Sequence, residues 1–137
     1  MKIIILEGLD GSGKTTLKRH IDEATNYEYI FIDRLTGSTL TYDMATGRKD
    51  RKDILLDIEN RLSKDFLLVY CYAPIDVLMD RIEYKKDRLT RKMAVEQLKL
   101  FDKYLEMTPI KNIKVNTGED IEKCVSKIKL FIKNNGG

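Results

Sequence analysis

The chain has 137 residues, of which 42% are hydrophobic and 34% are charged. This length and composition favour one domain over residues 1–137, and they exclude collagen, a coiled-coil rod and a Pro/Gly-rich low-complexity chain. With 25 Lys and Arg against 22 Asp and Glu, the net charge of +3 is too small to indicate a nucleic-acid or membrane partner by itself.

In chain order, apolar runs that indicate strands alternate with apolar residues at helical spacing. The pattern predicts a strand at 3–6, a helix from 17 to 24, a strand at 29–32, a short helix within 38–47, a helix over 54–62, a strand at 66–72, helices over 75–82 and 94–105, a strand at 113–115 and a helix over 121–132. Residues 117–120 (Thr-Gly-Glu-Asp) resemble a capping box ahead of the last helix. This order predicts a three-layer α/β/α sandwich with a small, mainly parallel sheet of four or five strands.

The sequence shows no pattern typical of export or of a membrane span. No apolar segment reaches the roughly 18 to 20 residues that a span needs, and residues 3–6 are too few for the core of a signal peptide. Two cysteines, Cys71 and Cys124, form no CxxC motif and favour a reducing compartment. We therefore expect a cytoplasmic protein without a membrane partner.

A glycine-rich segment follows the first predicted strand. Residues 8–15 read Gly-Leu-Asp-Gly-Ser-Gly-Lys-Thr, which fits the pattern G-x-x-x-x-G-K-[ST] between a strand and a helix. Glycines let successive backbone N–H groups turn toward phosphate oxygens, and the start of the helix adds its positive dipole end. We expect this phosphate loop to bind ATP through Asp10, Gly11, Ser12, Gly13, Lys14, Thr15 and Thr16.

The same segment predicts a magnesium-dependent site. Lys14 would place its charge on the β- and γ-phosphates, and Thr15 would offer its hydroxyl to Mg²⁺. Asp33 ends the second predicted strand, so it should lie at the carboxyl edge of the sheet, where open α/β sheets bind ligands. We predict that Thr15 and Asp33 hold Mg²⁺, although an ordinary residue at the end of a strand is the alternative interpretation of Asp33.

Two segments together resemble the thymidylate kinase family of P-loop nucleoside and nucleotide kinases. Residues 7–16 look like the phosphate loop of that family. Residues 33–42 (DRLTGSTLTY) resemble its D-R-Y-x-x-S-x-x-A-Y motif, with Leu35 in place of Tyr and Thr41 in place of Ala. The resemblance implies the P-loop NTPase fold, ATP and Mg²⁺ as cofactors, and nucleotides as substrates.

The helix that follows the third predicted strand also fits this family. Pro74 and Arg81 fall where the family has Pro and Arg, at the start of the helix that leads into its lid. A short lid is therefore expected at about 83–93. Gly11 places the sequence with the family members whose catalytic arginine comes from the lid, so Arg81 and Arg88 would reach the transferring phosphoryl group.

The acceptor side resembles the family only in part. Asp10 would face the sugar of the acceptor, and Arg34 would hold its phosphate. Only residues 17–28 separate the phosphate loop from the second strand, so the segments that read the base in this family are missing. The chain looks like a shortened, bacteriophage-type member, which implies a location in the host cytoplasm. The sequence does not predict which base the acceptor nucleotide carries. Candidates to stack on a base, or else core residues, are Tyr42, Tyr70 and Tyr72.

Three functions remain open from the sequence. The first is ATP-dependent phosphoryl transfer to a deoxynucleoside monophosphate. The second is a kinase for a hydroxyl acceptor, either a nucleoside or a polynucleotide 5′ end, with Asp33 as the base. The third is a nucleotide-binding module without transfer activity. The residues predicted to act in catalysis are Lys14, Asp33, Arg34, Arg81 and Arg88. The family commonly forms dimers, so a homodimer is expected.

Overall fold

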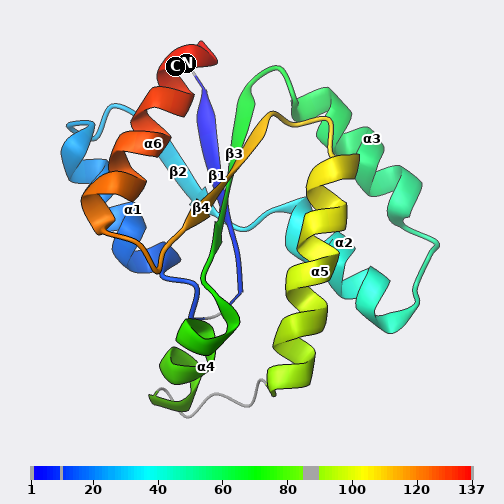
Figure 1. Cartoon of the computed structure of the whole chain (residues 1–137). Helices are drawn as coiled ribbons and strands as arrows, with labels where there is room; N and C mark the ends of the chain where they lie inside the picture. The colour runs from blue at the N-terminus through cyan, green and yellow to red at the C-terminus, as the bar shows by residue number, and fades with distance from the viewer. Residues whose placement is uncertain (1, 10, 85–89, 137) are drawn as a thin grey trace.

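The computed structural model describes residues 2–9, 11–84 and 90–136. Four parallel strands form a sheet that lies between two layers of helices, as Figure 1 shows. This is the α/β architecture predicted from the sequence, with the predicted order of elements and four strands.

The strands are β1 (Ile3–Glu7), β2 (Ile30–Asp33), β3 (Phe66–Tyr72) and β4 (Asn112–Asn116). The helices are α1 (Lys14–Ala24), α2 (Thr36–Thr46), α3 (Lys52–Leu62), α4 (Ile75–Tyr84), α5 (Arg91–Met107) and α6 (Ile121–Asn134). The predicted boundaries differ from these mainly at helix ends, because the first and last turns are polar and show no apolar period.

The order of the strands in the sheet is β2-β1-β3-β4. The chain moves from β1 to β2 on one side and then returns to β3 on the other side of β1. Open α/β sheets bind ligands beside such a reversal, outside the carboxyl ends of the strands. The register places Leu6 opposite Asp33 and Glu7 opposite Tyr70, so the ends of three strands meet at one edge.

The core lies on both faces of the sheet because successive strand residues point to opposite sides. On β1, Ile4 and Leu6 pack with residues of α1 and α6, whereas Ile5 packs with residues of α2 and α5. Figure 1 shows α1 and α6 on one side of the sheet and α2, α3 and α5 on the other. Burial on both faces explains why β1 and β3 read as continuous apolar runs.

Helix α4 lies at the carboxyl edge of the sheet, next to the phosphate loop (Figure 1). Its Leu78 and Ile82 form a small apolar cluster with Ala94 of α5. A Cβ atom added to Gly11 would lie 3.3 Å from Cγ1 of Ile82 and 3.4 Å from Cδ1 of Leu78. The helix therefore covers the loop directly. The central part of the predicted lid, residues 85–89, lies outside the described residues.

The prediction that Thr117 caps α6 is wrong. The N-cap of α6 is Asp120, whose side chain accepts a hydrogen bond from the backbone N–H of Glu122 at 3.2 Å. Thr117 continues from β4, and its backbone N–H donates to the carbonyl oxygen of Tyr72 at 2.7 Å. This hydrogen bond to β3 keeps Thr117 outside the helix. The hydroxyl of Thr117 faces the phosphate loop instead.

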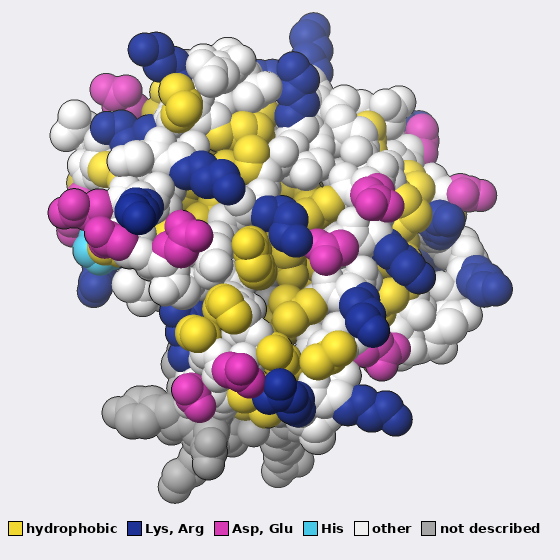
Figure 2. Space-filling model, in the orientation of Figure 1, with side chains coloured by type: hydrophobic (Ala, Val, Ile, Leu, Met, Phe, Trp, Pro, Cys, Tyr) yellow, Lys and Arg dark blue, Asp and Glu magenta, His cyan; other side chains and the backbone are white. Residues whose placement is uncertain are grey.

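The surface mixes charges of both signs. Figure 2 shows Lys and Arg side chains interspersed with Asp and Glu on the face over α5 and β4, with hydrophobic side chains gathered between them. This distribution agrees with the small net charge of +3. Within the described part of the chain, no helix combines the length and the apolar character needed to cross a bilayer.

Candidate active site

The phosphate loop turns sharply between β1 and α1. Gly11 and Gly13 have φ angles of +82° and +84°, which are left-handed values that favour glycine. A Cβ atom on Gly8 would lie 2.3 Å from the carbonyl oxygen of Cys71, so only glycine fits against β3 there. Gly13 is the N-cap of α1 and has no side chain with which to cap this helix. The backbone N–H groups at such a helix start can bind a phosphate group.

Lys14 is folded into the loop. Its Nζ atom donates to the carbonyl oxygen of Gly8 at 2.8 Å and lies 3.7 Å from Oδ1 of Asp33. The Lys14 side chain is only 7% exposed, whereas that of Asp33 is 56% exposed. The structure thus brings together the lysine and the aspartate that the sequence analysis singled out. The ammonium is held at the place where the loop, β1 and β2 meet.

The residues at the start of α1 fit a nucleotide with its magnesium ion. Thr15 and Thr16 are exposed in the first turn of the helix, while Ser12 is buried and its hydroxyl has no hydrogen-bond partner among the residues that the structure describes. Within the described residues, no group of three or more His, Cys, Asp and Glu side chains could hold a metal ion alone. Mg²⁺ in nucleotide sites takes one or two protein oxygens and completes its shell with phosphates and water. Thr15 and Asp33 are suited to that arrangement.

Arg81 joins two loops at the carboxyl edge. Its Nη1 donates to the carbonyl oxygen of Gly11 and to Oγ1 of Thr117, both at 3.0 Å, and its Nη2 donates to the carbonyl oxygen of Thr117 at 2.9 Å. The Thr117 hydroxyl also lies within hydrogen-bonding distance of the carbonyl oxygen of Ser12. Arg81 therefore lies beside the loop, with its guanidinium bonded to two backbone carbonyl groups and the Thr117 hydroxyl. Its role at the transferring phosphoryl group stays a prediction.

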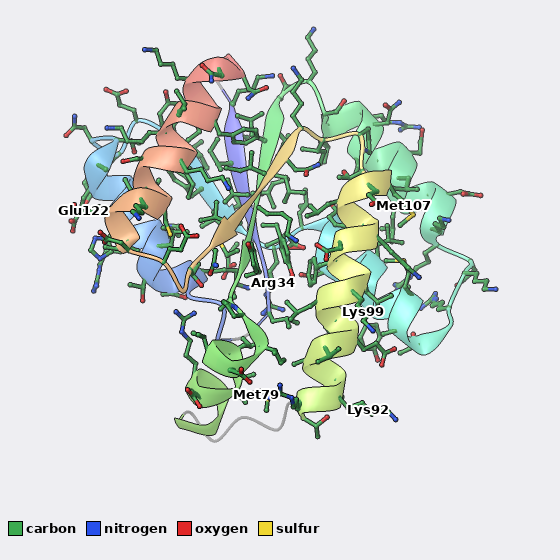
Figure 3. The ribbon with its side chains drawn as sticks, in the orientation of Figure 1. Arg34, Met79, Lys92, Lys99, Met107 and Glu122 are labelled. Atoms are coloured by element: carbon green, nitrogen blue, oxygen red, sulfur yellow. The ribbon has the colours of Figure 1, made fainter. Side chains whose placement is uncertain are left out.

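Arg34 follows β2 in an unusual backbone conformation. Its φ angle is +63°, a left-handed value, and its N–H donates to the carbonyl oxygen of Leu6 at 2.9 Å. The residue is exposed at the carboxyl edge of the sheet (Figure 3). Left-handed non-glycine residues are uncommon and cluster at functional sites. This turn carries Arg34 on the same edge as Lys14 and Asp33.

The sequence analysis missed Glu7, the last residue of β1. Glu7 is fully buried and accepts hydrogen bonds from the N–H of Leu35 at 3.1 Å and from the hydroxyl of Ser38 at 3.0 and 3.1 Å. Burial raises the pKa of Glu7 to about 7, against the opposing effects of these hydrogen bonds and of Lys14 and Arg34. A charged residue that ends an apolar strand directly before the phosphate loop was the available signal.

Other predicted residues have different outcomes. Asp10 and Arg88 lie outside the described residues, so their roles stay predictions. Tyr70 is a core residue, because it is buried and stacks on Phe101 with ring centroids 4.8 Å apart. Tyr42 is 63% exposed on α2 and stays a candidate for stacking on a base.

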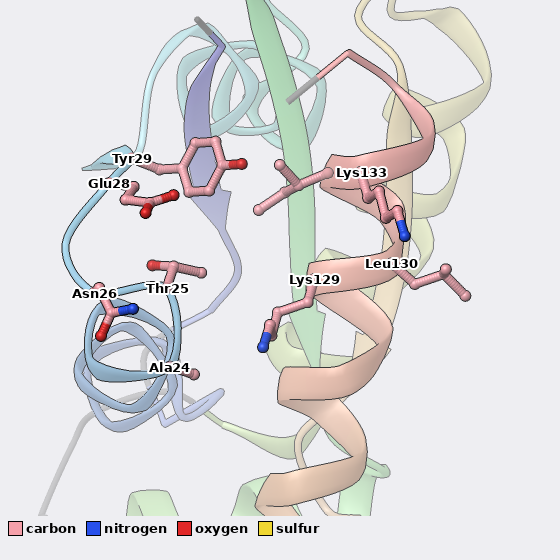
Figure 4. A pocket seen from close by; sticks show the side chains of 9 residues that line it. Ala24, Thr25, Asn26, Glu28, Tyr29, Lys129, Leu130 and Lys133 are labelled. Atoms are coloured by element: carbon pink, nitrogen blue, oxygen red, sulfur yellow. The ribbon is translucent and has the colours of Figure 1, made fainter.

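A cavity of about 460 Å³ lies away from this site. It opens between the end of α1, the turn before β2 and the last turns of α6, and Figure 4 shows Glu28 and Lys129 pointing into it. The phosphate loop precedes α1, so the cavity is at the opposite end of that helix. It therefore plays no part in the candidate site.

Comparison with known proteins places this geometry in context. No family model matches the sequence. A shikimate kinase from Sulfurihydrogenibium sp. (strain YO3AOP1) is 24% identical over 164 residues, which cover 94% of this chain and 99% of that protein.

Three solved structures share the fold. The YorR protein from Bacillus subtilis in complex with phosphorylated GDP has a TM-score of 0.78 at 18% identity, with 96% of each chain covered. Deoxyadenosine kinase from M. mycoides with bound dCTP has a TM-score of 0.71 at 15% identity, with 98% of this chain and 100% of that chain covered. Shikimate kinase from Acinetobacter baumannii in complex with shikimate has a TM-score of 0.57 at 18% identity, with coverage of 100% and 96%. The chain therefore has the α/β fold of the P-loop kinases.

Proposed function

We propose that this protein is an ATP-dependent kinase that transfers the γ-phosphoryl group to a deoxynucleoside monophosphate. The position of Lys14 is the observation that carries the proposal. Its ammonium is nearly buried, 2.8 Å from the carbonyl oxygen of Gly8 and 3.7 Å from Asp33. Phosphoryl transfer depends on positioning and on charges arranged in advance, and a buried cation in a glycine-rich loop supplies both. The kinases found among similar proteins support the same reaction type.

Each part of the loop has a task in this reaction. The N–H groups at the start of α1 bind the phosphates of ATP, and Lys14 neutralises charge on the β- and γ-phosphate oxygens. Thr15 and Asp33 would hold Mg²⁺, which supplies further neutralisation of the phosphate charge when it is bound. Arg81 fixes the loop by binding the carbonyl oxygen of Gly11. Arg88 of the predicted lid is proposed to reach the transferring group.

Arg34 is assigned to bind the phosphate group of the acceptor. Arg34 is an exposed residue on the sheet edge that also carries Asp33 and Lys14. A guanidinium matches the geometry of a phosphate group and can bind it through two parallel hydrogen bonds. A monophosphate acceptor is already ionised at neutral pH, so this reaction requires no general base.

A kinase for a hydroxyl acceptor is the second candidate, and Glu7 favours it. A hydroxyl nucleophile needs a base, and a carboxyl group with a pKa of about 7 is matched to that task. Glu7 joins Asp33 as a candidate base, because burial raises the pKa of Glu7 at this edge of the sheet. Deoxyadenosine kinase and shikimate kinase, which share the fold, are named for acceptors that carry hydroxyl groups.

One panel of assays separates the candidates. Purified protein is incubated with ATP and Mg²⁺ and, in turn, with each deoxynucleoside monophosphate, each deoxynucleoside, shikimate and a 5′-hydroxyl oligonucleotide. A deoxynucleoside diphosphate formed from the added monophosphate supports the proposal, and a phosphorylated hydroxyl supports the second candidate. ATP binding without transfer to any acceptor would overturn both and leave a nucleotide-binding module. A Lys14→Met variant is the control for contaminating kinases.

The dependence of the rate on pH gives a second discrimination. If a hydroxyl is the acceptor, kcat should rise as the pH passes through about 7 and Glu7 loses its proton, and Glu7→Gln should abolish that rise. If a monophosphate is the acceptor, the Glu7→Gln variant should keep the wild-type pH profile.

A further inference from the structure

A second buried carboxylate lies behind the carboxyl edge of the sheet. Glu59 of α3 is fully buried, and its oxygens accept hydrogen bonds from three hydroxyl groups. The donors are Oγ1 of Thr36, Oη of Tyr104 at 2.5 Å and Oγ1 of Thr108 at 2.6 Å. Within the part of the chain that the structure describes, Glu59 forms no salt bridge. Burying a carboxylate costs free energy unless the group is well hydrogen-bonded. The three donors meet that requirement and connect Glu59 to several parts of the fold.

The three hydroxyl groups come from different places in the fold. Thr36 is the first residue of α2, whereas Tyr104 belongs to the last part of α5 and Thr108 follows that helix. Burial, followed by the charge of Glu59, raises the pKa of Tyr104, so its phenol stays protonated and donates. Glu59 thus ties the start of α2 to α3 and α5.

The start of α2 needs such support, because the turn that leads into it is strained. Arg34 has a left-handed φ of +63°, and the next residue, Leu35, is an N-cap without a side-chain hydrogen bond to the helix. Strained backbone persists only where the surrounding structure holds it from several directions. Glu7 holds this turn from β1 by accepting from the N–H of Leu35, and Glu59 holds it from α3 through Thr36.

The packing of the first turn of α2 is equally tight. A Cβ atom on Gly37 would lie 2.6 Å from Oε2 of Glu7 and 2.7 Å from Cε2 of Tyr104. The backbone of α2 is therefore packed directly against Glu7 and Tyr104, and Tyr104 donates a hydrogen bond to Glu59. A small shift of Tyr104 or Glu59 would move the first turn of α2, and Arg34 precedes this turn by two residues.

We propose that Glu59 is a positioning residue for the Arg34 turn and thereby sets the affinity for the acceptor. The inference rests on the proposed function in one respect, the assignment of Arg34 to acceptor binding. Glu59 touches neither substrate. It acts through Thr36, which transmits the position of α3 and α5 to the turn.

The test uses Thr36→Val, which keeps the shape of the side chain and removes the hydroxyl that binds Glu59. We expect the KM for the acceptor to rise at least tenfold, while the KM for ATP stays within twofold of wild type. Thr36→Ser restores the hydroxyl and should recover most of the affinity. Thr46→Val is the matched control on the same helix, because the Thr46 hydroxyl donates to carbonyl oxygens of α2 itself. An unchanged acceptor KM, or an equal rise for both substrates, would overturn the proposal.

Hydrogen exchange tests the same link without any activity. In Thr36→Val, and in Tyr104→Phe as a second variant, amide exchange in residues 34–38 should become at least tenfold faster, with exchange in residues 11–17 unchanged. If wild type phosphorylates no acceptor, the proposed function fails, and exchange still decides the positioning role. Unchanged exchange in residues 34–38 of both folded variants would refute that role.

Discussion

The guanidinium of Arg81 donates two hydrogen bonds to Thr117, one to its hydroxyl at 3.0 Å and one to its carbonyl oxygen at 2.9 Å. Because Arg81 also binds the carbonyl oxygen of Gly11 at 3.0 Å, one side chain from α4 connects the phosphate loop with the loop between β4 and α6. Hydrogen bonds that involve a charged group and are shielded from water are stronger than surface ion pairs. The shape of the phosphate loop should therefore depend on Arg81.

Replacement of Arg81 tests this dependence. Arg81→Ala should raise the Kd for ATP at least tenfold and lower the free energy of unfolding by about 2 kcal/mol, because three hydrogen bonds to the guanidinium are lost. Isothermal titration calorimetry and denaturant unfolding measure the two effects. Arg61→Ala is the control, since Arg61 forms an exposed ion pair with Asp57 on α3, and such pairs contribute about 0–1 kcal/mol. Equal effects of the two substitutions would contradict the assignment.

Lys14 should be needed for the chemical step. Lys14→Met keeps most of the apolar length of the side chain and removes the charge that lies 3.7 Å from Asp33. We expect kcat to fall by about 100- to 1000-fold, which is the scale seen when one group that stabilises the transition state is lost. Steady-state kinetics checks this, with Lys18→Met as the control, because Lys18 pairs with Asp22 on the side of α1. Retention of wild-type kcat in Lys14→Met would rule out the proposed role.

Glu7 should make the protein less stable as the pH rises. Its pKa is about 7 in the folded chain, against an ordinary value of 4.5 that applies to the unfolded chain. Between these pH values the folded state holds a proton that the unfolded state has lost. The free energy of unfolding therefore decreases from pH 4.5 to pH 7, by up to about 3 kcal/mol from this group.

Comparison of Glu7→Gln with wild type isolates that contribution. Gln has no proton to lose, so the difference in unfolding free energy between the two proteins should change across this pH window and level off above it. Denaturant unfolding at a series of pH values measures the difference. Glu96→Gln, at an exposed position on α5, controls for the Glu-to-Gln substitution itself. A constant difference for Glu7→Gln as well would disprove the raised pKa.

Gly37 should not tolerate a side chain, although it lies in a helix. Alanine normally favours a helix over glycine by about 1 kcal/mol. Here the added Cβ would lie 2.6 Å from Glu7 and 2.7 Å from Tyr104, so we expect Gly37→Ala to destabilise the protein by about 1–3 kcal/mol and to weaken acceptor binding.

Gly47 offers a comparison that separates crowding from backbone conformation. It has a φ of +77°, and a Cβ there would meet no atom of the described residues within 4 Å, so Gly47→Ala should cost only about 1 kcal/mol for its left-handed backbone. Acceptor binding should be unchanged in this variant. A Gly37→Ala protein that melts at or above the wild-type temperature would show that the first turn of α2 can shift.

Much of the fold could be predicted because its signals are local. Continuous apolar runs and helical spacing specify strands and helices over a few residues, and they yielded the order of all ten elements. The phosphate loop is also a local feature, since its glycines, Lys14 and Thr15 are consecutive or nearly so. The capping prediction at Thr117 failed because pairing with β3 competes with helix capping, and local sequence does not report that competition.

The sequence by itself therefore determined the α/β class, the position of the phosphate loop and the placement of Asp33 and Arg34 at the end of a strand. Only the tertiary structure decided the strand order, the buried state of Glu7 and Glu59, and the bonding of Arg81 to Thr117. The physical reason is distance along the chain. Thr36 and Glu59 are 23 positions apart, and Arg81 and Thr117 are 36 apart. The spacing of residues within one helix or strand therefore cannot reveal either contact. Their contacts, and the pKa shift that burial imposes on Glu7, exist only after the sheet and its helices have packed.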